Sequence, residues 1–122
     1  MNKCIGIVGS RRRNQDYDYH ALLNVFDSVY EEGDSIVSGG CHKGGDKFAN
    51  WIAKARGLTI TVHYPNWKRF GKGAGFIRNT KIANDCNVLI AMVSEDRSGG
   101  TEDTVEKCVS QGKKIYFVEE KL

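Results

Sequence analysis

Glycine-rich turns follow three apolar segments of the sequence and are its clearest candidates for chemistry. The longest turn, residues 38–46, contains four glycines, follows a short β-branched apolar run and precedes apolar residues at helical spacing. A strand, a glycine loop and a helix together can present backbone N–H groups and a helix N-terminus to an anion. The same glycines also suit a tight turn that needs only a positive φ. This stretch alone therefore leaves a phosphate loop and a plain turn equally open.

Two further turns of this kind follow the apolar runs 4–8 and 88–92. In a parallel sheet, ligands bind at the carboxyl ends of the strands, where the strand order reverses. We therefore predict one pocket there for a phosphate-bearing, nucleotide-like small molecule, with Arg78 as a bidentate partner of the anion. Its predicted binding residues are Gly9, Ser10, Arg11, Ser38, Gly39, Gly40, Gly44, Asp46, Arg78, Asn79, Ser98, Gly99, Gly100 and Thr101.

The elements that must position these turns alternate between strand and helix along the whole chain. The apolar pattern predicts strands at 4–8, 35–37, 58–64, 88–92 and 115–118, with a helix in each interval and the third helix at 76–84. Such alternation is typical of an α/β, Rossmann-like, three-layer domain with a mostly parallel sheet between helices. We expect one domain over residues 1–122 and the strand order 3-2-1-4-5, because the third strand alternates like an edge strand. Residues 66–75 form the longest stretch that we expect to be irregular.

Composition excludes several classes of protein. The net charge of +3, from 18 basic and 15 acidic residues, is too small to indicate nucleic-acid binding by itself. Four scattered cysteines without a C-x-x-C pair predict reduced thiols and no metal site. The absence of a signal-peptide pattern and of a long apolar segment predicts a cytoplasmic protein without a membrane partner. No Walker A loop or G-x-G-x-x-G fingerprint is present, which disfavours kinase-like and nicotinamide chemistry, and we expect no cofactor.

The turns also match a known set of motifs in order. These are Gly9-Ser10-Arg11; Ser38-Gly39-Gly40 with Gly44, Asp46 and Ala49; Trp67, Gly71, Ala74-Gly75 and Arg78-Asn79; and Gly99-Gly100-Thr101. In these blocks the chain resembles the small bacterial and phage branch of the SLOG superfamily of Rossmann-like proteins. The resemblance implies a nucleotide or nucleotide-derived ligand held by the glycine loops, and a homo-oligomer, commonly a dimer. The leading hypothesis is accordingly a sensor or binder of a nucleotide-like ligand.

Two alternatives follow from relatives in that superfamily. The LOG phosphoribohydrolases cleave the N-glycosidic bond of nucleoside monophosphates, with an arginine corresponding to Arg78 and a glutamate at the position that Thr104 holds here. A nucleoside 5′-monophosphate N-glycosidase would have to use the neighbouring Glu102 or Asp103, so the catalytic candidates are Arg78, Glu102 and Asp103.

The second alternative is single-stranded nucleic-acid binding that resembles the DNA-processing protein DprA. The basic residues that would serve it are Arg11, Arg12, Arg13, Lys68, Arg69 and Lys72. We do not favour this alternative from the sequence.

Overall fold

A five-stranded parallel sheet forms the centre of the molecule in the computed structural model, which describes residues 2–119. Its strands are β1 (Cys4–Gly9), β2 (Ser35–Gly39), β3 (Ile60–His63), β4 (Val88–Met92) and β5 (Lys114–Phe117). All neighbouring pairs run parallel, in the order β3-β2-β1-β4-β5. The predicted strand order and the single α/β domain with a Rossmann-like fold are therefore confirmed.

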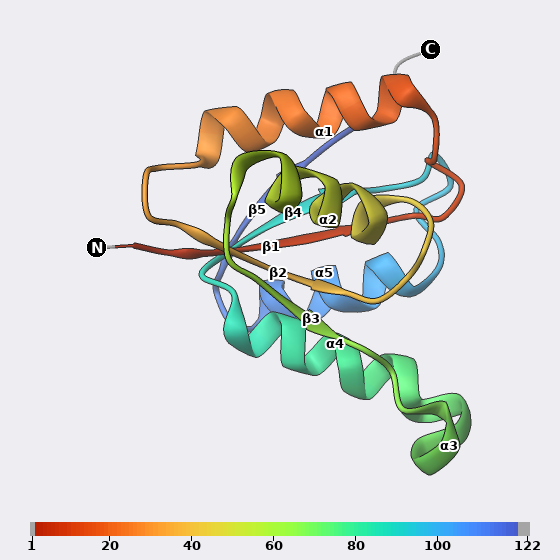
Figure 1. Ribbon diagram of the computed structural model, residues 1–122. Helices are drawn as coiled ribbons and strands as arrows, with labels where there is room; N and C mark the ends of the chain where they lie inside the picture. Colours follow the sequence, from red (N-terminus) through yellow and green to blue (C-terminus); the bar gives the residue numbers. More distant parts are fainter. Residues whose placement is uncertain (1, 120–122) are drawn as a thin grey trace.

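Helices cover both faces of this sheet (Figure 1). On one face lie α1 (Asp16–Val29) and α2 (Gly45–Arg56), and on the other α4 (Ala74–Asp85) and α5 (Gly100–Ser110). Two separate cores result, because alternate strand residues point to opposite faces: Ile5 and Ile7 pack beneath α1 and α2, whereas Val8 packs beneath α4 and α5. Burial on both faces explains why the inner strands are continuous apolar runs.

The stretch 66–75, expected to be irregular, is instead largely helical. It contains the single turn α3 (Trp67–Phe70) and the 3-10 turn η1 (Gly71–Gly73), and α4 begins at Ala74 rather than at residue 76. None of the residues of α3 and η1 is buried, and the glycines at 71, 73 and 75 are poor helix formers, which is why the sequence favoured an irregular stretch here. The turn is closed locally, since the Asn66 side chain accepts a hydrogen bond from the Arg69 backbone N–H at 3.1 Å. In Figure 1, α3 projects away from the body of the domain.

Candidate functional site

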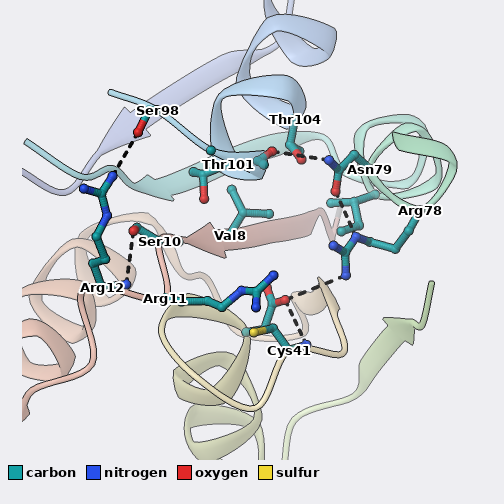
Figure 2. Close-up of a pocket in the computed structure, with 15 residues that line it drawn as sticks. Val8, Ser10, Arg11, Arg12, Cys41, Arg78, Asn79, Ser98, Thr101 and Thr104 are labelled. Atoms are coloured by element: carbon teal, nitrogen blue, oxygen red, sulfur yellow. Dashed lines mark hydrogen bonds and ion pairs between the residues drawn. The ribbon is translucent and has the colours of Figure 1, made fainter. Parts of the chain in front are cut away.

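A cavity of about 260 Å³ opens at the carboxyl ends of β1 and β4, beside the first turns of α2 and α5 and the middle of α4 (Figure 2). Loops and helices from distant parts of the sequence supply its walls. It is lined by Val8, Gly9, Ser10, Arg11, Arg12, Cys41, Asp46, Arg78, Asn79, Ile82, Ser98, Gly99, Gly100, Thr101 and Thr104.

Two glycines allow the end of β1 to lie directly against the start of α2. A Cβ atom on Gly45 would lie 2.5 Å from the Gly9 nitrogen, and one on Gly9 would lie 2.9 Å from the Gly45 Cα. Gly44, at φ 72°, donates its N–H to Asn14 Oδ1 at 2.9 Å. The backbone of this loop is thus fixed by close packing on the β1–α1 loop, which places the first turn of α2 at the cavity.

Asp46 is the carboxylic acid among the lining residues, and it is almost completely buried. Burial raises the pKa of Asp46, against the opposing effect of its hydrogen bonds with Cys41 and Ser38 and of the charge of Arg78. Two hydrogen bonds hold the carboxyl group in place: the Ser38 hydroxyl, which also lies 2.5 Å from the Ile7 carbonyl, donates to Asp46 Oδ1 at 2.9 Å, and the Cys41 N–H donates to Asp46 Oδ2 at 3.1 Å.

Arg78 brings a positive charge to the opposite wall. Its Nε donates to Asn79 Oδ1 at 2.8 Å, and its Nη1 lies 4.0 Å from Asp46 Oδ2. Asn79 is held in turn, since its Nδ2 donates to Asp103 Oδ2 at 3.0 Å. A guanidinium has more donors than these contacts use, and among residues 2–119 none accepts a hydrogen bond from Arg78 Nη2. Figure 2 shows the side chain reaching into the cavity.

The first turn of α5 closes the third side of the cavity. No side chain caps it, and its N-cap residue Gly99 takes φ 98°. The first N–H groups of a helix have no intrahelical acceptor and carry a partial positive charge. Gly100 and Thr101 line the cavity, so this turn offers N–H donors to an anion on the side facing Arg78.

Three consecutive arginines have three different environments. Arg11 is exposed at the cavity, and Arg12 is held by Asp96 at 2.6 Å and by hydrogen bonds to Ser94 and Ser98. The hydrogen bond from Arg12 keeps the pKa of Asp96 well below its usual range. Arg13 is only 2% exposed, where it pairs with Asp18 at 2.9 Å. It also donates to the backbone carbonyls of Val93, Val118 and Glu119. A nucleic-acid surface made of residues 11–13 therefore cannot include Arg13.

Most predicted binding residues line the cavity, and four of them do not. The four are Ser38, Gly39, Gly40 and Gly44. The Ser38 hydroxyl hydrogen-bonds to the Asp46 carboxyl group. Gly39 leaves room for Arg78, because a Cβ at residue 39 would clash with Arg78 Nη1. Gly40 lies under the ring of Tyr64 in the same way. These glycines thus serve close packing in this structure.

The cavity also contains residues that the binding prediction missed, namely Val8, Arg12, Cys41, Ile82 and Thr104. Two of them had a sequence signal: Arg12 as a basic residue of the nucleic-acid alternative, and Thr104 at the position of the LOG glutamate. Neither acidic catalytic candidate lines the cavity. Glu102 pairs with Arg97 at 2.9 Å, and Asp103 pairs with Lys107 at 2.6 Å. Arg78 is the one catalytic candidate that does line it.

Comparison with known proteins supports the fold. The X-ray structure of TM1055, a structural-genomics target, matches with a TM-score of 0.66 over 94% of this chain and 72% of that chain. The sequence identity is 15%, so the likeness extends to the fold alone. No family model matches the sequence, and no curated protein matches it significantly.

Two further features bear on possible partners. Within residues 2–119 no helix has the length and apolar character needed to cross a bilayer. The same residues contain no group of three or more His, Cys, Asp or Glu side chains placed to hold a metal ion.

Proposed function

We propose that this protein binds a small nucleotide-like ligand through its phosphate in the cavity at the carboxyl ends of β1 and β4. The observation that carries the proposal is the position of Arg78, whose Nη2 group is available opposite the uncapped first turn of α5. A guanidinium and a helix N-terminus on two sides of one cavity are complementary to a phosphate.

The charge balance of the lining supports an anionic ligand. Arg11 and Arg78 line the cavity together with one carboxyl group, that of Asp46, whose pKa is raised by burial, while the charge of Arg12 is balanced by Asp96. The volume of about 260 Å³ is close to the lower end of the range for small-molecule sites, roughly 300–1,000 Å³, which suits a mononucleotide better than a dinucleotide. The geometry of the cavity supports the phosphate, and the resemblance to the SLOG motifs is the reason for proposing that this phosphate belongs to a nucleotide.

Binding without hydrolysis is the form of the function that the geometry supports best. An N-glycosidase needs a carboxylate at the developing oxocarbenium centre. Glu102 and Asp103 are committed to Arg97 and Lys107, and the cavity presents Thr104 at the motif position of the glutamate. We therefore propose a sensor or carrier of the ligand rather than a phosphoribohydrolase.

A thermal-shift panel tests this function. Nucleoside 5′-monophosphates at about 100 times their Kd should stabilise the fold by about 2.7 kcal/mol, whereas the corresponding nucleosides should cause no shift. Chromatography of the same mixtures should find no free base. Equal shifts with nucleosides, or none with any phosphate, would contradict phosphate recognition, and steady base release would contradict a purely binding role.

The homodimer and the cytoplasmic location stay predictions, and sedimentation equilibrium of the purified protein measures the first of them directly.

A further inference from the structure

The single turn α3 and the adjoining η1, residues 67–73, form an arm whose side chains serve no core. No residue of either turn is buried, and Trp67 and Phe70 are 56% and 40% exposed. The arm touches the body mainly through α4, where the Trp67 ring passes close to Gly75. An isolated helical turn gains little stability by itself. Large aromatic side chains that are exposed to solvent on such a turn indicate a binding surface for a partner.

The charge of this region identifies the chemistry of that partner. Lys68, Arg69 and Lys72 are all exposed on the arm. Between Tyr64 and Asn84 the sequence contains no aspartate or glutamate, although the whole chain carries 15 acidic residues. The net charge of +3 is thus unevenly distributed, and the arm is complementary to a polyanion.

The apolar side chains of the arm favour a nucleic acid among polyanions. Among residues 64–77 the exposed large apolar side chains are aromatic except for Ile77, which is 37% exposed. Tyr64 and Phe76, which flank the arm, are 70% and 59% exposed. Aromatic rings stack on bases of any sequence, whereas an anionic membrane surface is usually bound by a helix with an aliphatic face.

We propose that the arm binds single-stranded nucleic acid, with Trp67 and Phe70 stacking on bases and Lys68, Arg69 and Lys72 contacting phosphates. This site lies outside the cavity, since none of these five residues is among its lining, and it is therefore independent of the proposed nucleotide binding. Arg69 already lies over the Phe70 ring, 5.1 Å from its centroid, so a base and a phosphate can be held side by side there.

Fluorescence anisotropy of a labelled oligothymidylate about 15 nucleotides long, within the range of single-strand binding sites, tests the proposal on the whole protein. The unmodified protein should bind at low salt, and log K should fall linearly with log [salt]. Replacing Lys68, Arg69 and Lys72 together by alanine should reduce that slope by about 2, at about 0.7 for each phosphate contact. Trp67→Ala should weaken binding about 5- to 150-fold while leaving the slope unchanged.

The other tryptophan of the chain supplies a matched control. Trp51 on α2 is 43% exposed and has Lys47 over its ring at 4.7 Å, but α2 covers the opposite face of the sheet. Trp51→Ala should change the affinity less than twofold. In a Trp51→Phe background Trp67 is the sole tryptophan, and the oligothymidylate should quench its fluorescence.

Several results would overturn the proposal. They are no anisotropy change at low salt, equal losses from Trp67→Ala and Trp51→Ala, and binding of phosphatidylserine vesicles in place of the oligothymidylate. Arg78→Ala separates the two sites. The variant should retain oligothymidylate binding even if the nucleotide proposal fails, whereas loss of oligothymidylate binding would place the strand in the cavity and refute the arm.

Discussion

Replacing Arg78 by alanine should remove the main anion contact of the cavity and leave the fold intact. Arg78 Nη2 has no acceptor among residues 2–119, so in the complex it is free to donate to the ligand phosphate. A hydrogen bond to a charged group contributes roughly 1.5–3 kcal/mol, which corresponds to an affinity loss of about 10- to 150-fold. The variant also loses the Nε hydrogen bond to Asn79, which costs about 1 kcal/mol of stability.

Isothermal titration calorimetry with a nucleoside 5′-monophosphate measures the first effect, and urea denaturation measures the second. Lys81→Ala is the matched control, because Lys81 is a cation on the same helix that is exposed and does not line the cavity. Arg78→Lys should recover part of the affinity, since lysine restores the charge without the planar fork. An Arg78→Ala affinity within twofold of the unmodified protein, or an equal loss in Lys81→Ala, would refute the assigned role of Arg78.

Three further substitutions test how the site is built, each by urea denaturation. Because burial raises the pKa of Asp46, its contribution to stability is complete in acid and is lost as pH rises through its folded pKa. Asp46→Asn should therefore gain stability relative to the unmodified protein as pH rises above about 4, and the opposite trend would contradict a raised pKa of Asp46. Arg13→Met should cost about 3–5 kcal/mol by leaving the buried Asp18 carboxylate unpaired, and adding Asp18→Leu should restore much of that loss. Gly45→Ala should cost about 1–3 kcal/mol, because its Cβ meets backbone atoms, whereas Gly73→Ala meets nothing within 4 Å and should stay within about 0.5 kcal/mol; equal effects would contradict the packing explanation.

The order of elements was predictable because four strands are apolar runs, the third alternates between apolar and polar residues, and each interval contains apolar residues at helical spacing. The strand order followed from the alternating pattern of the third strand, which β3 confirms by pairing only with β2 at the sheet edge. The helical arm was not predicted, since glycines at 71, 73 and 75 outweighed the short helical spacing of Trp67, Phe70 and Ala74. The exposure of the Trp67 and Phe70 rings was not predictable either, because these residue types more often pack inside a protein.

Side-chain environments in the site depend on contacts between distant segments. Arg11, Arg12 and Arg13 are the same residue type in a row, yet their environments differ. Arg11 faces the cavity, Arg12 pairs with Asp96 in the loop before α5, and Arg13 is buried against the chain that follows β5. Glu102 and Asp103 were attractive as catalytic groups for their type and position. The pairing of Asp103 with Lys107 is an i,i+4 pair that helical spacing could have indicated, whereas the pairing of Glu102 with Arg97 depends on the course of the loop before α5.

Backbone amide chemical shifts measured during titration with a nucleoside 5′-monophosphate give the most direct test of the proposed site. The proposal predicts saturable shifts that are largest at Gly9, Ser10 and residues 99–101, because these amides surround the cavity beside Arg78. Much smaller shifts should accompany the matching nucleoside, which lacks the phosphate. Shifts that avoid these amides, or that are equal for the nucleoside, would contradict phosphate binding in the cavity.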